Sequence, residues 1–228
     1  MLNFRNIFMF LALLFLISCG GPVATPAPSN QTYRYLALGD SYTIGESVSE
    51  TERWPNQLAA LVDPSKEIEV TIIARTGWTT SELWEGIQAA NPQGTYDMVS
   101  LLIGVNNQYR GYDMDEYREE FRFLLGKAVE FADGKPEHVI VLSIPDWGVT
   151  PFAWGRDTGQ IAADIDAYNA INLEESKKAG VHYVDVTPAS REAVTDQALI
   201  AGDGLHPSGK MYAEWAKLAL SIAVKILE

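Results

Sequence analysis

The stretch that indicates the fold is YLALGDSYTIG, residues 35–45. In it, a short apolar run at residues 35–38 is closed by Gly39 and Asp40, and Ser41 follows at once. Four more apolar or β-branched runs lie at residues 68–74, 98–103, 139–144 and 181–186. Continuous runs of this kind, rather than alternating ones, are typical of strands covered on both faces, as in a parallel sheet.

Helical patterns separate these predicted strands. Capping-box patterns at residues 49–52 and 79–82 each predict a helix start, the first helix running through residue 62. Apolar residues three and four positions apart predict helices over 114–131 and around 161–168. Pro207 suits the first position of a last helix. The predicted buried positions of that helix are Met211, Trp215, Leu218, Ile222 and Ile226.

Strand–helix units that follow one another in this way predict an α/β fold. We expect a three-layer α/β/α sandwich around a doubly wound, five-stranded parallel sheet, as in flavodoxin-like proteins. We assign residues 33–228 to this single domain. Ligands of such sheets bind at the carboxyl ends of the strands, so the residues that follow each apolar run are the first candidates for a site.

Composition excludes several classes of function. The chain has 228 residues, of which 47% are hydrophobic and 21% charged, as in a globular domain. Lys and Arg number 17 against 30 Asp and Glu, a net charge of -13, so a phosphate backbone would be repelled and we expect no nucleic-acid partner. With Cys19 as the only cysteine, the chain has no internal disulfide and no cysteine-based zinc site.

The first residues are typical of an export signal. An apolar run at residues 7–17 follows Arg5 and is too short to span a bilayer as a helix. The sequence Leu16-Ile17-Ser18-Cys19 resembles the lipobox of bacterial lipoproteins. This resemblance implies a signal peptide over residues 1–18, cleaved before a lipid-bearing Cys19. An ordinary secretory signal with a chance cysteine is the alternative.

The lipobox resemblance also implies where the protein resides. A lipid on Cys19 would hold the protein on a membrane of the exported bacterial cell envelope, on the periplasmic or outer-membrane side. Residues 19–32 are rich in Pro, Gly, Ser and Thr, and we expect them to form a flexible tether between the lipid and the domain.

Four clusters at or near the predicted strand ends contain residues that can react with a ligand or let it approach the backbone closely. A serine hydroxyl such as that of Ser41 needs a base, usually histidine, near neutral pH. His138 and His182 stand at strand starts, the wrong edge for this site, whereas His206 lies in a loop that enters a helix. Asp203 is three residues before it and can accept the imidazole N–H.

The two remaining clusters offer hydrogen-bond donors. Gly77 follows the second strand and lets a ligand approach the backbone closely. Asn106 follows the third strand, and its side-chain amide can donate to a developing oxyanion. Taken singly, each of the four clusters also fits an ordinary turn or cap.

Together these blocks resemble the SGNH (GDSL) hydrolase family, and the resemblance spans the chain from about residue 33 to the C-terminus. The matching blocks are Gly39-Asp40-Ser41, Gly77, Gly104-Val105-Asn106 and Asp203 with His206, and residues 144–151 resemble a loop of bacterial members. The family implies that Ser41 is the nucleophile, His206 the base and Asp203 its orienting partner. It implies an oxyanion hole made of the Ser41 and Gly77 backbone N–H groups and the Asn106 amide, with no metal and no organic cofactor. Asn107 departs from the aspartate that many members carry.

The function that the resemblance implies is that of a serine esterase with an acyl-enzyme on Ser41. Lipase-, lysophospholipase- and thioesterase-like activities on small-molecule, glycan or lipid esters all fit it. A carbohydrate O-acetylesterase is the alternative within enzymes, and a flavodoxin-like binding module without turnover is the alternative outside them. Trp78, Trp147 and Trp154 lie near the expected site edge, where ordinary packing is favoured over sugar stacking or an acyl groove.

Overall fold

The computed structural model describes residues 32–228. The predicted signal peptide, Cys19 and residues 19–31 of the predicted tether lie outside the described residues. Thr32, which we had placed at the end of the tether, is the first residue of strand β1.

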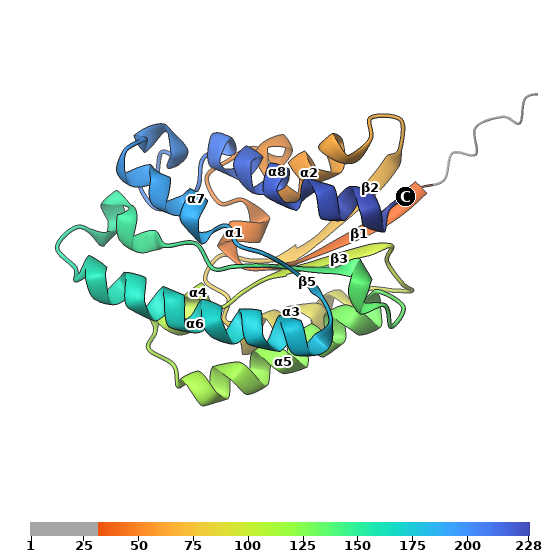
Figure 1. Cartoon of the computed structure of the whole chain (residues 1–228), viewed down its shortest axis with the longest axis horizontal. Coiled ribbons are helices and arrows are strands. Elements are labelled where there is room, and N and C mark those ends of the chain that lie inside the picture. The colour runs from red at the N-terminus through yellow and green to blue at the C-terminus, as the bar shows by residue number, and fades with distance from the viewer. Residues whose placement is uncertain (1–31) are drawn as a thin grey trace, which may run out of the picture.

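The sheet is the five-stranded parallel sheet that the apolar runs predicted. Its strands are β1 (Thr32–Gly39), β2 (Glu67–Ala74), β3 (Met98–Leu102), β4 (Val139–Leu142) and β5 (His182–Val184). They lie in the order β2-β1-β3-β4-β5, and all neighbours are parallel (Figure 1). Every residue of β3 and β4 is buried, which explains why these strands are apolar except at Ser100, whose hydroxyl is hydrogen-bonded to that of Tyr35 at 2.8 Å.

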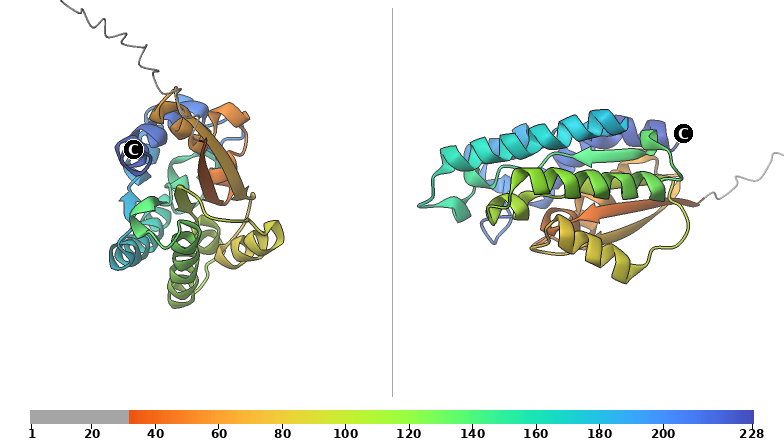
Figure 2. Two further views of the ribbon diagram at one scale, coloured as in Figure 1. Left: turned by 90° about the vertical axis from the view of Figure 1, so that its right-hand side faces the viewer. Right: turned by 90° about the horizontal axis from the view of Figure 1, so that it is seen from below.

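Helices cover both faces of the sheet, as Figures 1 and 2 show. On one face lie α2 (Trp54–Val62) and α8 (Gly209–Ile226). On the other lie α3 (Thr80–Ala90), α5 (Met114–Phe131) and α6 (Thr158–Ala179). The predicted three-layer, doubly wound sandwich is therefore confirmed. No helix within residues 32–228 has the length and apolar character that crossing a membrane requires.

Short helices stand at the carboxyl ends of the strands and were not predicted. They are α1 (Ser41–Ile44) after β1, α4 (Val105–Tyr109) after β3 and α7 (Thr187–Arg191) after β5. Single 3₁₀ turns occupy Glu50–Glu52, Pro136–His138, Trp147–Val149, Pro151–Ala153, Glu192–Val194 and Gln197–Leu199. The three short helices place polar residues at the edge of the sheet formed by the carboxyl ends of the strands.

The first predicted helix is interrupted. The capping box of Ser49 and Glu52 closes a 3₁₀ turn, Arg53 is extended (φ -61°, ψ 135°), and α2 starts afresh at Trp54. Pro55 causes the break, because it has no N–H to donate and its ring would collide with the carbonyl four residues earlier. Within the first turn of α2 the missing N–H has no cost.

The last helix also differs from its prediction. It begins at Gly209 with Ser208 as its cap, while Pro207 pairs with Ile200 in an isolated antiparallel bridge. Leu218 is 47% exposed, and its predicted burial is wrong. The buried positions are Met211, Tyr212, Trp215, Ala216, Ala219 and Ala223. The core face is thus rotated toward alanines, whose small side chains allow a close helix approach.

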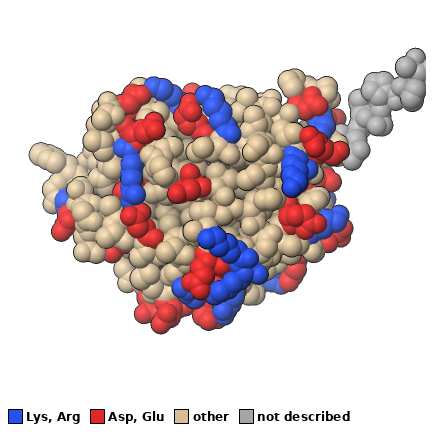
Figure 3. All heavy atoms as spheres, in the orientation of Figure 1, with Lys and Arg blue, Asp and Glu red and all other residues tan. Residues whose placement is uncertain are grey.

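The acidic surplus is carried on the surface together with basic side chains. Figure 3 shows Lys and Arg interspersed with Asp and Glu over one face. Some of these charges pair, as Arg118 does with Glu174 at 2.8 Å and with Glu175 at 2.6 Å. The exposed pairs contribute little to stability, whereas Glu175 is buried and its charge is balanced by Arg118 and Lys178.

Candidate active site

The site begins where β1 ends, at Gly39. A Cβ on Gly39 would stand 2.5 Å from the Leu102 carbonyl oxygen and would collide with the Thr43 hydroxyl, so only glycine fits. Asp40 then caps α1, its Oδ1 accepting the Tyr42 N–H at 3.0 Å. Ser41 is consequently the first residue of α1, and it is 4% exposed.

Asp40 is a fully buried carboxyl next to the candidate nucleophile. Burial raises its pKa to about 7, although the hydrogen bond from the Tyr42 N–H acts in the opposite direction. Its second oxygen, Oδ2, has no hydrogen-bond partner among the described residues. The negative charge of Asp40 is therefore poorly stabilised in its surroundings.

His206 and Asp203 form a compact turn before α8. Asp203 Oδ1 accepts the backbone N–H groups of Leu205 at 2.9 Å and His206 at 3.0 Å, while Oδ2 lies 2.6 Å from His206 Nδ1. With the Nδ1 proton donated to this carboxylate, Nε2 is left as the basic nitrogen of the ring. The predicted base and its predicted partner are thus in direct contact.

The charge of Asp203 is stabilised by its neighbours. Partial burial alone would raise the pKa of Asp203, but hydrogen bonds from Ser47, His206 and Leu205 outweigh it and hold the pKa well below the usual range. The bond from Ser47 Oγ to Asp203 Oδ2 is 2.7 Å long and joins residues 156 positions apart. Asp203 therefore remains ionised at neutral pH.

Ser47 was missed by the sequence analysis. It stands in the loop after α1 with a left-handed backbone (φ 67°), a conformation that costs a non-glycine residue energy. Its hydroxyl ties the loop of Ser41 to the loop of His206. No local pattern marks such a residue, because its partner is distant in the sequence.

Gly77 is placed by a loop that Arg110 braces. Gly77 has φ 88°, and a Cβ there would meet only Arg110 Nη2, at 3.8 Å, so the conformation rather than crowding requires glycine. Arg110 donates to the Gly77 carbonyl at 2.6 Å and pairs with Glu82 at 3.2 Å. No acceptor for the Gly77 N–H is found within residues 32–228.

Asn106 reaches the same edge from the end of β3. It lies in α4, and its Nδ2 donates to the Trp78 carbonyl at 2.9 Å, which leaves the second amide N–H for a ligand. Gly104, which caps α4, has φ 125° and lies so close to Ile144 and Tyr117 that a Cβ would be 2.8 Å from Ile144 Cδ1. The turn that presents Asn106 therefore depends on glycine.

Asn107 connects two elements. It is fully buried, its Oδ1 accepts the Thr80 N–H at 3.1 Å, and its Nδ2 donates to the Thr80 hydroxyl at 2.7 Å. Asn107 thus fixes α4 against the first turn of α3. Where many family members carry aspartate, Asn107 thus uses both its amide donor and its amide acceptor within the fold. Asn107 does not line the cavity described next.

One cavity of about 160 Å³ joins the predicted residues. Ser41, Gly77, Asn106 and His206 all line it, and Asp203 adjoins it through His206 Nδ1. The rest of its wall is largely apolar and is formed by Tyr42, Thr76, Val105, Tyr109, Trp147, Phe152 and Leu205. By contrast, His138 contacts the Asp97 carbonyl at 2.8 Å near the start of β4, at the opposite edge of the sheet.

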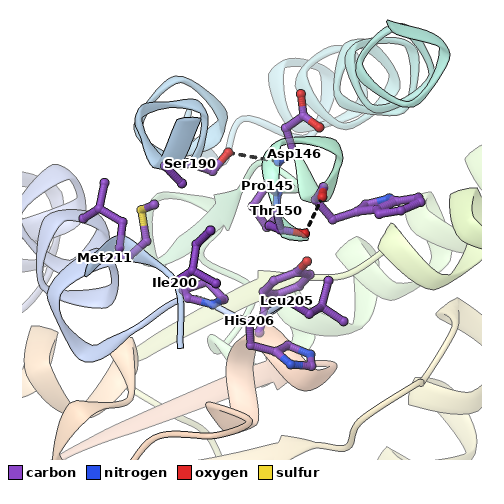
Figure 4. Close-up of a pocket in the computed structure, with 13 residues that line it drawn as sticks. Pro145, Asp146, Thr150, Ser190, Ile200, Leu205, His206 and Met211 are labelled. Atoms are coloured by element: carbon purple, nitrogen blue, oxygen red, sulfur yellow. Dashed lines mark hydrogen bonds between the residues drawn. The ribbon is translucent and has the colours of Figure 1, made fainter. Parts of the chain in front are cut away.

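A second cavity, of about 20 Å³, adjoins the first at His206. Figure 4 shows His206 on one side of it and Pro145 and Ser190 across from it. Its volume suits about one water molecule. Asp146 fixes this loop by accepting the Gly148 N–H at 2.8 Å and by pairing with Arg191 at 2.9 Å. The wall behind His206 is therefore held firmly.

The tryptophans near the site have different environments. Trp78 packs on α3, where a Cβ on Gly86 would overlap its ring. Trp147 is 4% exposed and donates from Nε1 to Gln108 Oε1 at 2.9 Å. Trp154 is 94% exposed, so the packing predicted for it is wrong. Within residues 32–228, no group of three or more His, Cys, Asp or Glu side chains is arranged to hold a metal ion.

Comparisons with known proteins address the family and the fold of the chain. A profile of the GDSL-like Lipase/Acylhydrolase family matches residues 37–214. None of the curated proteins matches the chain. Solved structures with the same fold include several that are distantly related in sequence.

Three of these structures illustrate the range. A member of the lipolytic protein G-D-S-L family from Veillonella parvula is 20% identical, with a TM-score of 0.65 over 84% of this chain and 97% of that one. The acetylxylan esterase Axe2 from Geobacillus stearothermophilus is 21% identical, with a TM-score of 0.62 over 84% and 94%. The esterase EstA from Pseudoalteromonas is 16% identical, with a TM-score of 0.66 over 86% and 98%. At these identities, the likeness shows the fold.

Proposed function

The chain belongs to the GDSL-like lipase/acylhydrolase family, whose members hydrolyse esters, and from this premise we propose that it cleaves small carboxylic esters through an acyl-enzyme on Ser41. The observation that carries the proposal is the shared cavity of Ser41, Gly77, Asn106 and His206, with Asp203 bonded to His206. A nucleophile, a base and oxyanion donors in one cavity are what acyl transfer requires.

The proposed reaction begins with Ser41. Its Oγ attacks the ester carbonyl while Nε2 of His206 accepts the hydroxyl proton, and the resulting imidazolium is stabilised by the carboxylate of Asp203. His206 then gives this proton to the departing alcohol, leaving the acyl group on Ser41. A water molecule, deprotonated by His206, releases the acid and restores the serine.

The negative oxygen of the tetrahedral intermediate needs donors that are already in place. Ser41, Gly77 and Asn106 line the cavity, and we assign this role to the backbone N–H groups of the first two and to the free amide N–H of Asn106. Removing one such donor typically lowers kcat by about 10²–10³-fold. Arg110 supports this role of Gly77 because its hydrogen bond to the Gly77 carbonyl holds the loop in place.

The cavity favours small acyl groups. Its volume of about 160 Å³ is close to that of an apolar protein cavity that binds benzene, of about 150 Å³. We therefore propose a short-chain ester, and the same size supports a carbohydrate O-acetyl ester as the second candidate. A long acyl chain would extend out of the cavity into solvent.

The decisive experiment is covalent labelling of Ser41. The wild-type domain is expected to bind one fluorophosphonate per chain and to hydrolyse p-nitrophenyl esters, fastest with acyl groups of about two to four carbons. Ser41→Ala is expected to abolish both, while Ser65→Ala, which changes an exposed serine, preserves both. A wild-type protein that is neither labelled nor active would indicate a flavodoxin-like binding module instead.

We also propose that Cys19 carries a lipid that holds the enzyme at a membrane of the exported cell envelope. The lipobox-like sequence at residues 16–19 supports this proposal. In a bacterium fed with labelled fatty acid, the full chain is expected to become labelled and to sediment with membranes. Cys19→Ser should lose both properties, and equal labelling of the two proteins would contradict the anchor.

A further inference from the structure

A second depression lies next to the proposed active site. It has a volume of about 570 Å³ and is lined by residues 149–151 and 153–156 together with Thr158 and Gln197. We call it the outer groove. Phe152, within the same segment, lines the catalytic cavity. One short piece of chain therefore borders the cavity on one side and the outer groove on the other.

Trp154 is the most unusual residue of the outer groove. It is 94% exposed, whereas Trp54 and Trp215 are fully buried and Trp147 is 4% exposed. A side chain this exposed buries little apolar area in the fold, and tryptophan is enriched at binding interfaces. Its indole ring offers a flat apolar face in the outer groove, two residues along the chain from Phe152, which lines the cavity.

Arg156 brings hydrogen-bond donors to the same groove. Its guanidinium lies 5.1 Å from the ring centre of Tyr109 and 5.3 Å from those of Trp147 and Phe152, and it donates to the Tyr109 hydroxyl at 3.0 Å. No carboxylate pairs with it within residues 32–228. The aromatic wall of the cavity thus holds Arg156 in place while most of its N–H groups stay free for a ligand.

Other polar groups of the groove are also available. Gln197 uses its Nε2 on the Ala193 carbonyl at 2.9 Å, which leaves its Oε1 as an acceptor. The Thr158 hydroxyl stands at the start of α6 and lines the groove. An indole face surrounded by a guanidinium, an amide oxygen and a hydroxyl matches a sugar ring, which has an apolar C–H face and a rim of hydroxyl groups.

We propose that the outer groove binds the sugar of an acylated carbohydrate, with its acyl group in the catalytic cavity. This inference rests on the proposed function and names the leaving alcohol as a glycan. The sizes support it, because a cavity of about 160 Å³ receives the acyl group and leaves the alcohol outside, and the outer groove is lined by the chain neighbours of Phe152, Pro151 and Ala153. A lipid surface would instead need a continuous apolar patch, and a chain with a net charge of -13 is repelled by anionic lipids.

Kinetics with two substrates test the proposal. The substrates are acetylated xylo-oligosaccharides and p-nitrophenyl acetate, which has no sugar. Trp154→Ala is expected to lower kcat/KM for the oligosaccharide about tenfold relative to that for p-nitrophenyl acetate, mostly through KM, as loss of one aromatic contact face predicts. Trp154→Phe is expected to recover most of this loss. Leu218→Ala, which removes an exposed apolar side chain on α8, is expected to alter neither value.

A binding measurement removes any contribution from chemistry. In the inactive Ser41→Ala protein, calorimetry is expected to give a Kd for the acetylated oligosaccharide that Trp154→Ala and Arg156→Gln each weaken several-fold. Lys177→Gln, which makes the same charge change at the far end of α6, is expected to leave that Kd unchanged. Circular dichroism of each variant establishes that it is folded.

The outcomes separate this inference from the proposed function. A wild-type enzyme that hydrolyses p-nitrophenyl acetate but not the oligosaccharide overturns the glycan site alone, as does equal loss on both substrates in Trp154→Ala. An enzyme inert on every ester overturns the proposed function itself. Loss of binding to phosphatidylcholine vesicles in Trp154→Ala, with unchanged oligosaccharide kinetics, would assign Trp154 to a lipid surface instead.

Discussion

Replacing Ser47 separates the activation of His206 from the stability of the fold. Ser47→Ala removes the 2.7 Å hydrogen bond to Asp203 but keeps the left-handed backbone at φ 67°. The bond reaches an ionised carboxylate, yet Ser47 is exposed and water can replace its hydroxyl, so we expect a loss of about 1 kcal/mol in the free energy of unfolding. Ser47→Gly loses the same bond but relieves about 1 kcal/mol of backbone strain, so its stability is expected to stay within about 0.5 kcal/mol of wild type.

The two variants are nevertheless expected to share one catalytic defect. Asp203 accepts the His206 Nδ1 proton on the same oxygen that Ser47 bonds. A defect of about 1 kcal/mol in stabilising the imidazolium corresponds to a roughly fivefold lower kcat. Urea unfolding gives the stabilities and p-nitrophenyl acetate turnover gives the rates.

Low pH provides an independent readout of the same bond. Because its hydrogen bonds lower the pKa of Asp203 in the folded state, they stabilise the protein above the unfolded-state pKa of about 4, and this contribution is lost as pH falls below it. Both variants should therefore lose less stability than wild type on acidification below about pH 4. Wild-type turnover in Ser47→Gly, or a rate defect that follows stability instead of the missing hydroxyl, would refute the reasoning.

Three other substitutions probe the site. Asp203→Asn removes the charge that stabilises imidazolium, so kcat should fall by at least about a hundredfold with little change in KM, and a smaller loss would argue against an orienting carboxylate. Asp40→Asn keeps the cap of α1 but removes a carboxyl whose pKa is raised by burial to about 7. The buried carboxyl lowers the stability of the wild type only as pH rises from about 4 to 7, where it ionises more readily in the unfolded chain than in the fold. In thermal unfolding, the variant should therefore be more stable than wild type by up to about 4 kcal/mol at pH 8 and equally stable at pH 4. Gly104→Ala places a Cβ 2.8 Å from Ile144 at φ 125° and should lower the free energy of unfolding in urea by about 3–5 kcal/mol. The control Gly111→Ala, where φ is 68° and the space is open, should lower it by about 1 kcal/mol, and similar losses in the two variants would contradict the crowding at Gly104.

The features that could be predicted from the sequence are those with a local cause. The strands were recognisable as apolar or β-branched runs because helices cover both faces of the sheet, and β3 and β4, whose residues are all buried, show this most clearly. The blocks around Ser41, Gly77, Asn106 and His206 follow or adjoin strand ends, and parallel strands bring such ends to one edge. Their meeting in one cavity was therefore foreseeable.

The features that could not be predicted depend on tertiary contacts. Ser47 and Arg110 look like ordinary surface residues until Asp203 and the Gly77 carbonyl are seen beside them. The rotation of α8 that exposes Leu218 depends on how closely its alanines approach neighbouring elements. Likewise, nothing in the sequence distinguishes the exposed Trp154 from the buried Trp147, because their difference lies in the path of the loop.

The hydrogen bond between Ser47 and Asp203 joins residues 156 positions apart in the sequence, one near the start of the domain and the other before its last helix. During synthesis, Ser41 therefore emerges from the ribosome long before His206 and has no base until the segment before the last helix has emerged and packed. A fragment that ends before this segment contains Ser41 but lacks both Asp203 and His206, so the base assigned to the serine is missing. Proteolytic removal of this C-terminal segment would for this reason abolish the activity while Ser41 stays intact.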